Sequence, residues 1–140
     1  MGPEARIEHV LVNSTEVQYE ASCFNPESQK LFFAAWGYPG HYWQYLLDAS
    51  TYELTNITTD PPTLNAHGCV YNQGSYVVAT DGGNGEYASI VQINGSTLKA
   101  ETLINNFYQQ PFLGFNDIDM DPNGNIWVTD SISAWVWDVK

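Results

Sequence analysis

The chain has 140 residues, of which 44% are hydrophobic and 14% aromatic, enough apolar material for one modest globular domain. Four Lys and Arg residues face sixteen Asp and Glu residues, and the resulting net charge of −12 argues against a nucleic-acid partner because it repels phosphate backbones. No apolar run reaches the length of about 18 residues that a membrane-spanning helix requires, so we expect no membrane insertion.

A strand–turn–strand pattern occurs three times along the chain. It covers residues 24–33, 70–78 and 120–128, and in each copy a turn rich in Pro, Asn or Gly separates two apolar strands. The period between equivalent positions, from residue 20 to 66 to 116, matches the size of a four-stranded propeller blade. No amphipathic helix pattern is visible. The sequence therefore predicts an all-β fold, a β-propeller with about three four-stranded blades per chain.

The blades follow one another along the chain as a single unit, residues 1–140. We expect residues 16–60 to form the first blade, 64–106 the second and 113–140 an incomplete third. Residues 1–12 have strand composition and are interpreted as an orphan closing strand. Because closed propellers typically have four to eight blades, we expect half of a six-bladed propeller, completed by a second chain in a homodimer that exchanges terminal strands. A fragment of a longer protein is the alternative.

Two cysteines hold equivalent places in neighbouring repeats. We expect Cys23 and Cys69 to lie on inner strands and to pack as small apolar groups. A disulfide between them is the less favoured alternative, because inner strands of adjacent blades converge without pairing. Localisation stays open, although three sequons permit glycosylation of a secreted protein: Asn13-Ser14-Thr15, Asn56-Ile57-Thr58 and Asn94-Gly95-Ser96.

Two segments carry a family resemblance. They are residues 19–33 (YEASCFNPESQKLFF) and residues 115–130 (FNDIDMDPNGNIWVTD). Both resemble motifs of the regucalcin/gluconolactonase family of six-bladed, calcium-dependent propellers, with its fungal lactonohydrolase-like branch the most similar. The resemblance spans nearly the whole chain but only the first half of the family's length. It implies a small-molecule enzyme with its site at the propeller axis.

The resemblance also implies a metal pair. Glu20 and Asn116 match family ligands of a catalytic divalent ion, Ca²⁺ in the first place, and calcium prefers carboxylate and amide oxygens from several strands. Ala21 and Ser22 replace the family's Gly-Pro, and the ligands from later blades have no counterpart in this sequence. A strand-end carboxylate and a turn residue without metal are the structural alternatives for the pair.

His67 and Asp117 are the candidate catalytic residues. His67 stands in an Ala-His-Gly step that looks like the position at which paraoxonase relatives of this superfamily place a catalytic histidine. An imidazole can take a proton from water near neutral pH, so we expect His67 or Asp117 to activate water. A hydrogen-bonded structural histidine is the alternative.

Aromatic residues gather in two predicted loops. We expect these loops to form a substrate pocket for a small apolar, oxygenated molecule, whereas packing between blades is the alternative for about half of them. The predicted pocket residues are Trp36, Tyr38, Tyr42, Trp43, Phe112 and Phe115.

The predicted function is metal-dependent hydrolysis of a lactone or ester. Two alternatives stay open. One is a natural-product biosynthetic cyclase, isomerase or cycloaddition catalyst on the same fold with no metal requirement, and the other is a non-catalytic binding propeller.

Overall fold

The structure, a computed structural model, describes residues 18–37, 41–82 and 86–131. The closing strand predicted at residues 1–12 and the third strand predicted for the last blade lie outside these residues. Every regular element in the described part of the chain is a β-strand, so the all-β class is confirmed. The described residues contain no helix long and apolar enough to cross a bilayer.

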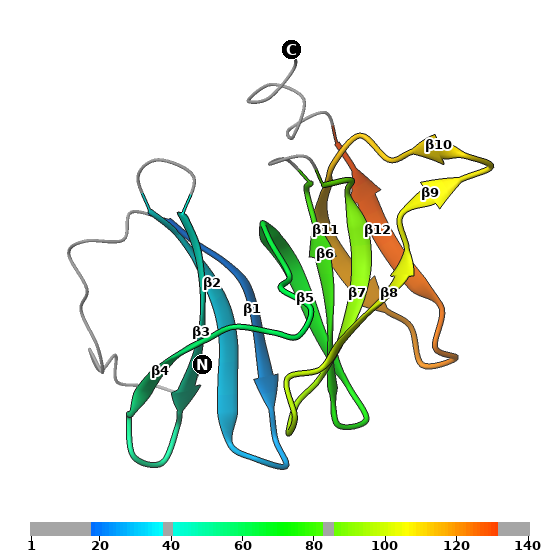
Figure 1. Cartoon of the computed structure of the whole chain (residues 1–140). Coiled ribbons are helices and arrows are strands. Elements are labelled where there is room, and N and C mark those ends of the chain that lie inside the picture. The colour runs from blue at the N-terminus through cyan, green and yellow to red at the C-terminus, as the bar shows by residue number, and fades with distance from the viewer. Residues whose placement is uncertain (1–17, 38–40, 83–85, 132–140) are drawn as a thin grey trace, which may run out of the picture.

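Two four-stranded antiparallel sheets form most of the molecule, and each has its strands in chain order (Figure 1). The first sheet consists of β1 (Gln18–Asn25), β2 (Lys30–Gly37), β3 (His41–Asp48) and β4 (Leu54–Ile57). The second consists of β5 (Ala66–Asn72), β6 (Ser75–Thr80), β7 (Ser89–Asn94) and β8 (Ala100–Ile104).

Two hairpins follow the second sheet. β11 (Phe115–Met120) pairs with β12 (Ile126–Asp130), and this pair repeats the β1–β2 and β5–β6 hairpins. The short strands β9 (Asn106–Phe107) and β10 (Gln110–Pro111) form an additional hairpin that the sequence did not predict. The division into a closing strand, two complete blades and a third incomplete blade stays a prediction, as do closure of a ring and pairing with a second chain.

Equivalent turns in the two sheets are built in the same way. The side-chain Oδ1 of Asp48 accepts hydrogen bonds from the backbone N–H groups two and three residues later, and Oδ1 of Asn94 does the same in the second sheet. Short side chains with an oxygen acceptor replace the missing ladder partners at such turns. The repeat in sequence is therefore a repeat of local hydrogen bonding.

β6 packs against both neighbouring sheets. All six of its residues are buried, and successive side chains point to opposite faces as the pleat requires. Tyr76 belongs to the core cluster shared with the first sheet, where its ring lies 5.1 Å from that of Phe32. Val77 belongs to a second cluster shared with Phe115 of β11. The three sheets thus stack face to face around β6, as Figure 1 shows.

A disulfide joins the first two sheets. Cys23 of β1 bonds to Cys69 of β5, and their Cα atoms lie 5.5 Å apart. The expectation that both cysteines pack as separate apolar groups was therefore wrong. The physical reason is that β1 and β5 contact each other directly, so that equivalent positions on the two inner strands come within bonding range.

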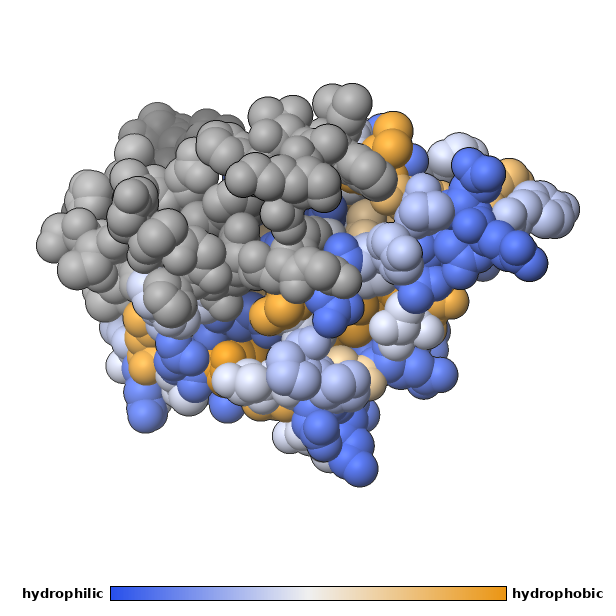
Figure 2. All heavy atoms as spheres, turned by 45° about the horizontal axis from the view of Figure 1, so that its top comes forward, coloured by the Kyte–Doolittle hydropathy of each residue, from blue (hydrophilic) through white to orange (hydrophobic). Residues whose placement is uncertain are grey.

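Hydrophilic residues cover most of the described surface that Figure 2 shows, and apolar residues form smaller patches on it. This distribution agrees with the net charge of −12.

Candidate functional site

The first strand of each hairpin carries a β-bulge at the same place. The pairing register shifts between Glu20 and Cys23 in β1, between Ala66 and Gly68 in β5, and between Phe115 and Ile118 in β11. In each case one extra residue is accommodated on the inner strand. A bulge re-aims the side chains beside it and commonly occurs next to functional sites. The hydrogen-bond ladder of the first two strands is therefore interrupted at the equivalent position in all three repeats.

These bulges surround a hollow with a volume of about 220 Å³. Its wall comes from β1, β5 and β11 and consists of Tyr19, Glu20, Ala21, Ser22, His67, Gly68, Cys69, Asn116 and Asp117. All four residues that the sequence assigned to a metal or to catalysis, Glu20, His67, Asn116 and Asp117, are brought together here. Since a cavity of about 150 Å³ can hold benzene, the hollow has room for a small ring. The roles of the four residues stay predictions.

Two backbone features shape the hollow. Ala21 has a φ of 56°, a left-handed conformation that glycine adopts more easily, and it stands where the resembled family has glycine. A Cβ on Gly68 would lie 2.8 Å from the backbone nitrogen of Ile118 and 2.9 Å from the Cα of Asp117. Only glycine allows β5 to approach β11 this closely. Gly68 thus sets the spacing between the two strands that carry His67 and Asp117.

The acidic and amide groups of the hollow are open to solvent. Asn116 and Asp117 are exposed and Glu20 is half-buried. The backbone N–H of Asp117 donates to Thr129 Oγ1 at 3.0 Å, and Asp117 Oδ1 accepts from the N–H of Ile118 at 2.9 Å. Asp117 is consequently held in place, with one carboxylate oxygen already engaged.

His67 has a different environment. It is 9% exposed, and its Nε2 lies 3.1 Å from Oδ2 of Asp81, which is 3% exposed. Asp81 directly follows β6 and was not among the predicted site residues. One signal could have found it, because Thr80-Asp81 recurs as Thr129-Asp130 at the end of the equivalent strand β12. The structure thus shows that the imidazole of His67 contacts a buried carboxylate, that of Asp81.

The three members of the predicted aromatic pocket whose side chains are described, Trp43, Phe112 and Phe115, do not line the hollow. The rings of Phe112 and Phe115 pack 4.5 Å apart against the cluster between β6 and β11, and Phe115 is only 1% exposed. Trp43 is half-buried on β3, Tyr38 lies outside the described residues, and nothing is described of the side chains of Trp36 and Tyr42. Of the described aromatic residues only Tyr19 lines the hollow, so the described wall is polar.

The hollow offers the donor types that calcium prefers, but few of them. Glu20, Asn116 and Asp117 contribute carboxylate and amide oxygens. Calcium takes roughly six to eight oxygen ligands. In the described part of the chain no group of three or more His, Cys, Asp or Glu residues could hold a metal ion. The described residues alone therefore do not complete a calcium site.

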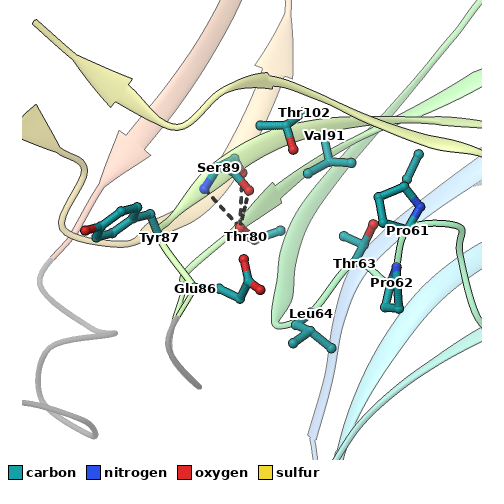
Figure 3. A pocket seen from close by; sticks show the side chains of 12 residues that line it. Pro61, Pro62, Thr63, Leu64, Thr80, Glu86, Tyr87, Ser89, Val91 and Thr102 are labelled. Atoms are coloured by element: carbon teal, nitrogen blue, oxygen red, sulfur yellow. Dashed lines mark hydrogen bonds between the residues drawn. The ribbon is translucent and has the colours of Figure 1, made fainter. Parts of the chain in front are cut away.

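A second, smaller cavity of about 60 Å³ lies between residues 61–64 and the strands β6, β7 and β8 (Figure 3). The Thr80 hydroxyl in its wall is satisfied, because it accepts from the backbone N–H of Ser89 and lies 3.0 Å from the Ser89 hydroxyl. Glu86 is the one carboxylate among its described lining residues. This cavity admits a few water molecules and assembles no catalytic set.

Comparison with known proteins supports a distant relationship. The chain is 26% identical over 148 residues to the lactonohydrolase oryL of Aspergillus oryzae, an alignment that covers 94% of this chain and 31% of the relative. The relationship is lactonohydrolase-like. The chain spans about a third of the length of that relative. No family model matches the chain, so membership of the propeller family is not established, and no solved structure matches it.

Proposed function

We propose that the hollow formed by the three bulges hydrolyses the lactone or ester bond of a small molecule. The observation that carries this proposal is the convergence of Glu20, His67, Asn116 and Asp117 from three sheets on one polar hollow. The similarity to a protein named a lactonohydrolase supports the reaction class.

His67 is the proposed general base. It removes a proton from a water molecule as the water oxygen attacks the carbonyl carbon. The proton is then transferred to the alkoxide oxygen that leaves when the ring C–O bond breaks, and a hydroxy acid results. His67 suits this role better than Asp117 because Asp81 lies against its ring, whereas one oxygen of Asp117 is already engaged with the N–H of Ile118. General-base catalysis of this kind contributes about 10²- to 10⁴-fold.

Asn116 is the proposed donor to the carbonyl oxygen. It is exposed at the bulge of β11, and its side-chain amide can donate a hydrogen bond to the oxygen on which negative charge develops. The carboxylates of Glu20 and Asp117 line the same wall and favour a neutral substrate over an anionic one. A neutral lactone meets this condition.

Calcium dependence is a separate proposal, with Glu20 and Asn116 as ligands. Their oxygen chemistry supports it, whereas the small number of described donors does not. None of the proposed steps at His67 and Asn116 requires a metal ion. A chelator separates the two cases, because hydrolysis that persists in excess EDTA removes the calcium proposal and leaves the role of His67 in place.

The test is hydrolysis of δ-valerolactone and p-nitrophenyl acetate by the full chain. His67→Gln should lower kcat by about 100-fold or more while the β-sheet circular dichroism spectrum is retained. Asn116→Ala should also lower kcat, whereas the matched control Asn123→Ala, at the exposed β11–β12 turn, should not. Equal rates for His67→Gln and the unsubstituted chain, or no hydrolysis by either, would overturn the proposal.

A further inference from the structure

We infer that Asp81 is a positioning residue for His67, whose ring it holds in one tautomer and one orientation. The consequence for catalysis rests on the proposed function, but the contact itself does not. The recurrence of Thr80-Asp81 as Thr129-Asp130 marks the position of Asp81 but does not show what its side chain contacts. The inference comes from the buried contact between the two side chains, which are 8% and 4% exposed.

The chemistry of the contact determines where the imidazole proton lies. An ionised carboxylate accepts hydrogen bonds and cannot donate them. Asp81 Oδ2 lies 3.1 Å from Nε2 of His67, so the proton of the neutral ring belongs on Nε2. The lone pair is then on Nδ1, which is buried in the structure and is the nitrogen that the proposed reaction requires as base once water reaches it. A carboxylate behind a histidine commonly fixes ring orientation in this way.

The backbone around Asp81 is itself held. The N–H of Asp81 donates to the carbonyl oxygen of Asn65 at 3.1 Å, and the side-chain amide of Asn65 donates to the carbonyl oxygen of Gly82. Gly82 has a φ of 79°, and a Cβ there would lie 2.7 Å from the backbone nitrogen of Ala88. Asn65 is 2% exposed. The carboxylate is therefore presented to His67 by a rigid, buried strand end.

The equivalent positions in the other repeats show that the fold does not require an acid here. Ala35 takes this place in the first sheet and is fully buried, opposite Tyr19. Asp130 takes it in β12, where Oδ1 accepts the backbone N–H groups of Leu113 and Gly114 at 2.9 and 3.0 Å. Asp81 differs from both, because its carboxylate faces a histidine. Burying a carboxylate is unfavourable unless it is paired, and His67 is the partner that the structure gives it.

The test compares Asp81→Asn with the matched control Asp130→Asn. Asparagine keeps the size of aspartate and one oxygen acceptor, so both variants should fold. In the full chain, ¹⁵N chemical shifts of the imidazole report the tautomer, and the signals of His67 are those missing from His67→Gln. We expect the Nε2–H tautomer in the unsubstituted chain and in Asp130→Asn, and loss of that single tautomer in Asp81→Asn.

Kinetics with δ-valerolactone provide the second measurement. Asp81→Asn should lower kcat roughly 10- to 100-fold with KM within about twofold, because the base is misoriented while the hollow is unchanged. If Asp81→Asn does not fold, Asp81→Ala, which copies Ala35 of the first sheet, replaces it. An Nε2–H tautomer that survives both substitutions would overturn the inference. Absence of hydrolysis by the unsubstituted chain would overturn the proposed function, and the tautomer measurement would still decide the role of Asp81.

Discussion

Removal of the Cys23–Cys69 disulfide should lower stability by an amount that its position allows us to calculate. The two cysteines are 46 residues apart in sequence, so the bond closes a long loop in the unfolded chain. In the chain-entropy description, a loop of this length corresponds to about 4 kcal/mol at 25 °C. For a chain of this size, 1 kcal/mol shifts Tm by roughly 3–5 °C, so the loss should be roughly 12–20 °C.

The assay is thermal unfolding followed by circular dichroism, with the unsubstituted chain measured before and after reduction. The double substitution Cys23→Ala and Cys69→Ala is the comparison, because Cys23 is buried and its removal also leaves a small space in the core. Reduction retains both sulfur atoms and isolates the effect of the bond. If the reduced chain melts at the same temperature as the oxidised chain, or if the native chain titrates with two free thiols, the reasoning fails.

Two further predictions use the backbone and the turns. Gly68→Ala should destabilise the chain by about 1–3 kcal/mol and lower hydrolysis, because its Cβ would meet backbone atoms of β11, whereas Gly74→Ala, with a φ of 84° and nothing within 4 Å, should affect unfolding but not hydrolysis. A Gly68→Ala chain with normal unfolding and normal rates would contradict the close approach. The side-chain amide and backbone N–H of Asn125 hold the pKa of Asp121 below its ordinary value, so the stability that the Asp121 carboxylate contributes is present above pH of about 4 and is lost as the pH falls through its folded pKa. Asp121→Ala should therefore lower Tm at pH 7, and the difference from the unsubstituted chain should shrink in acid unfolding experiments; a difference that is constant with pH would contradict this assignment.

The sequence predicted the strands and their order well where the repeat is regular. Apolar strands flank the turn at Gln73 and Gly74 and its counterpart at Asn123 and Gly124. Such turns depend on neighbouring residues, so they can be predicted from the sequence alone. The β9–β10 hairpin was missed because it lies in the longer interval between the second and third repeats, where no copy exists for comparison. Closure of a ring stays a prediction, because it depends on chain outside the described residues.

The sequence predicted which residues would come together at the candidate site, but not which residues would contact them. Glu20 and Asn116 occupy equivalent positions of the repeat, and His67 directly follows the corresponding residue, Ala66. The structure brings all three to one hollow. The contact of His67 with Asp81 joins two adjacent strands through a side-chain orientation that periodicity does not specify. The disulfide depends likewise on the distance between β1 and β5, and the burial of Phe115 depends on how closely β11 packs on β6.

The three equivalent bulges share one backbone irregularity but present different side chains. Ala21, His67 and Asp117 occupy one and the same place in successive repeats, yet they carry a methyl group, an imidazole and a carboxylate. The strand irregularity persists in all three, so it does not depend on any one of these side chains. A duplicated hairpin of this design can therefore acquire a new reactive group by a single codon change, with no new loop and no refolding, and each copy can do so independently of the others.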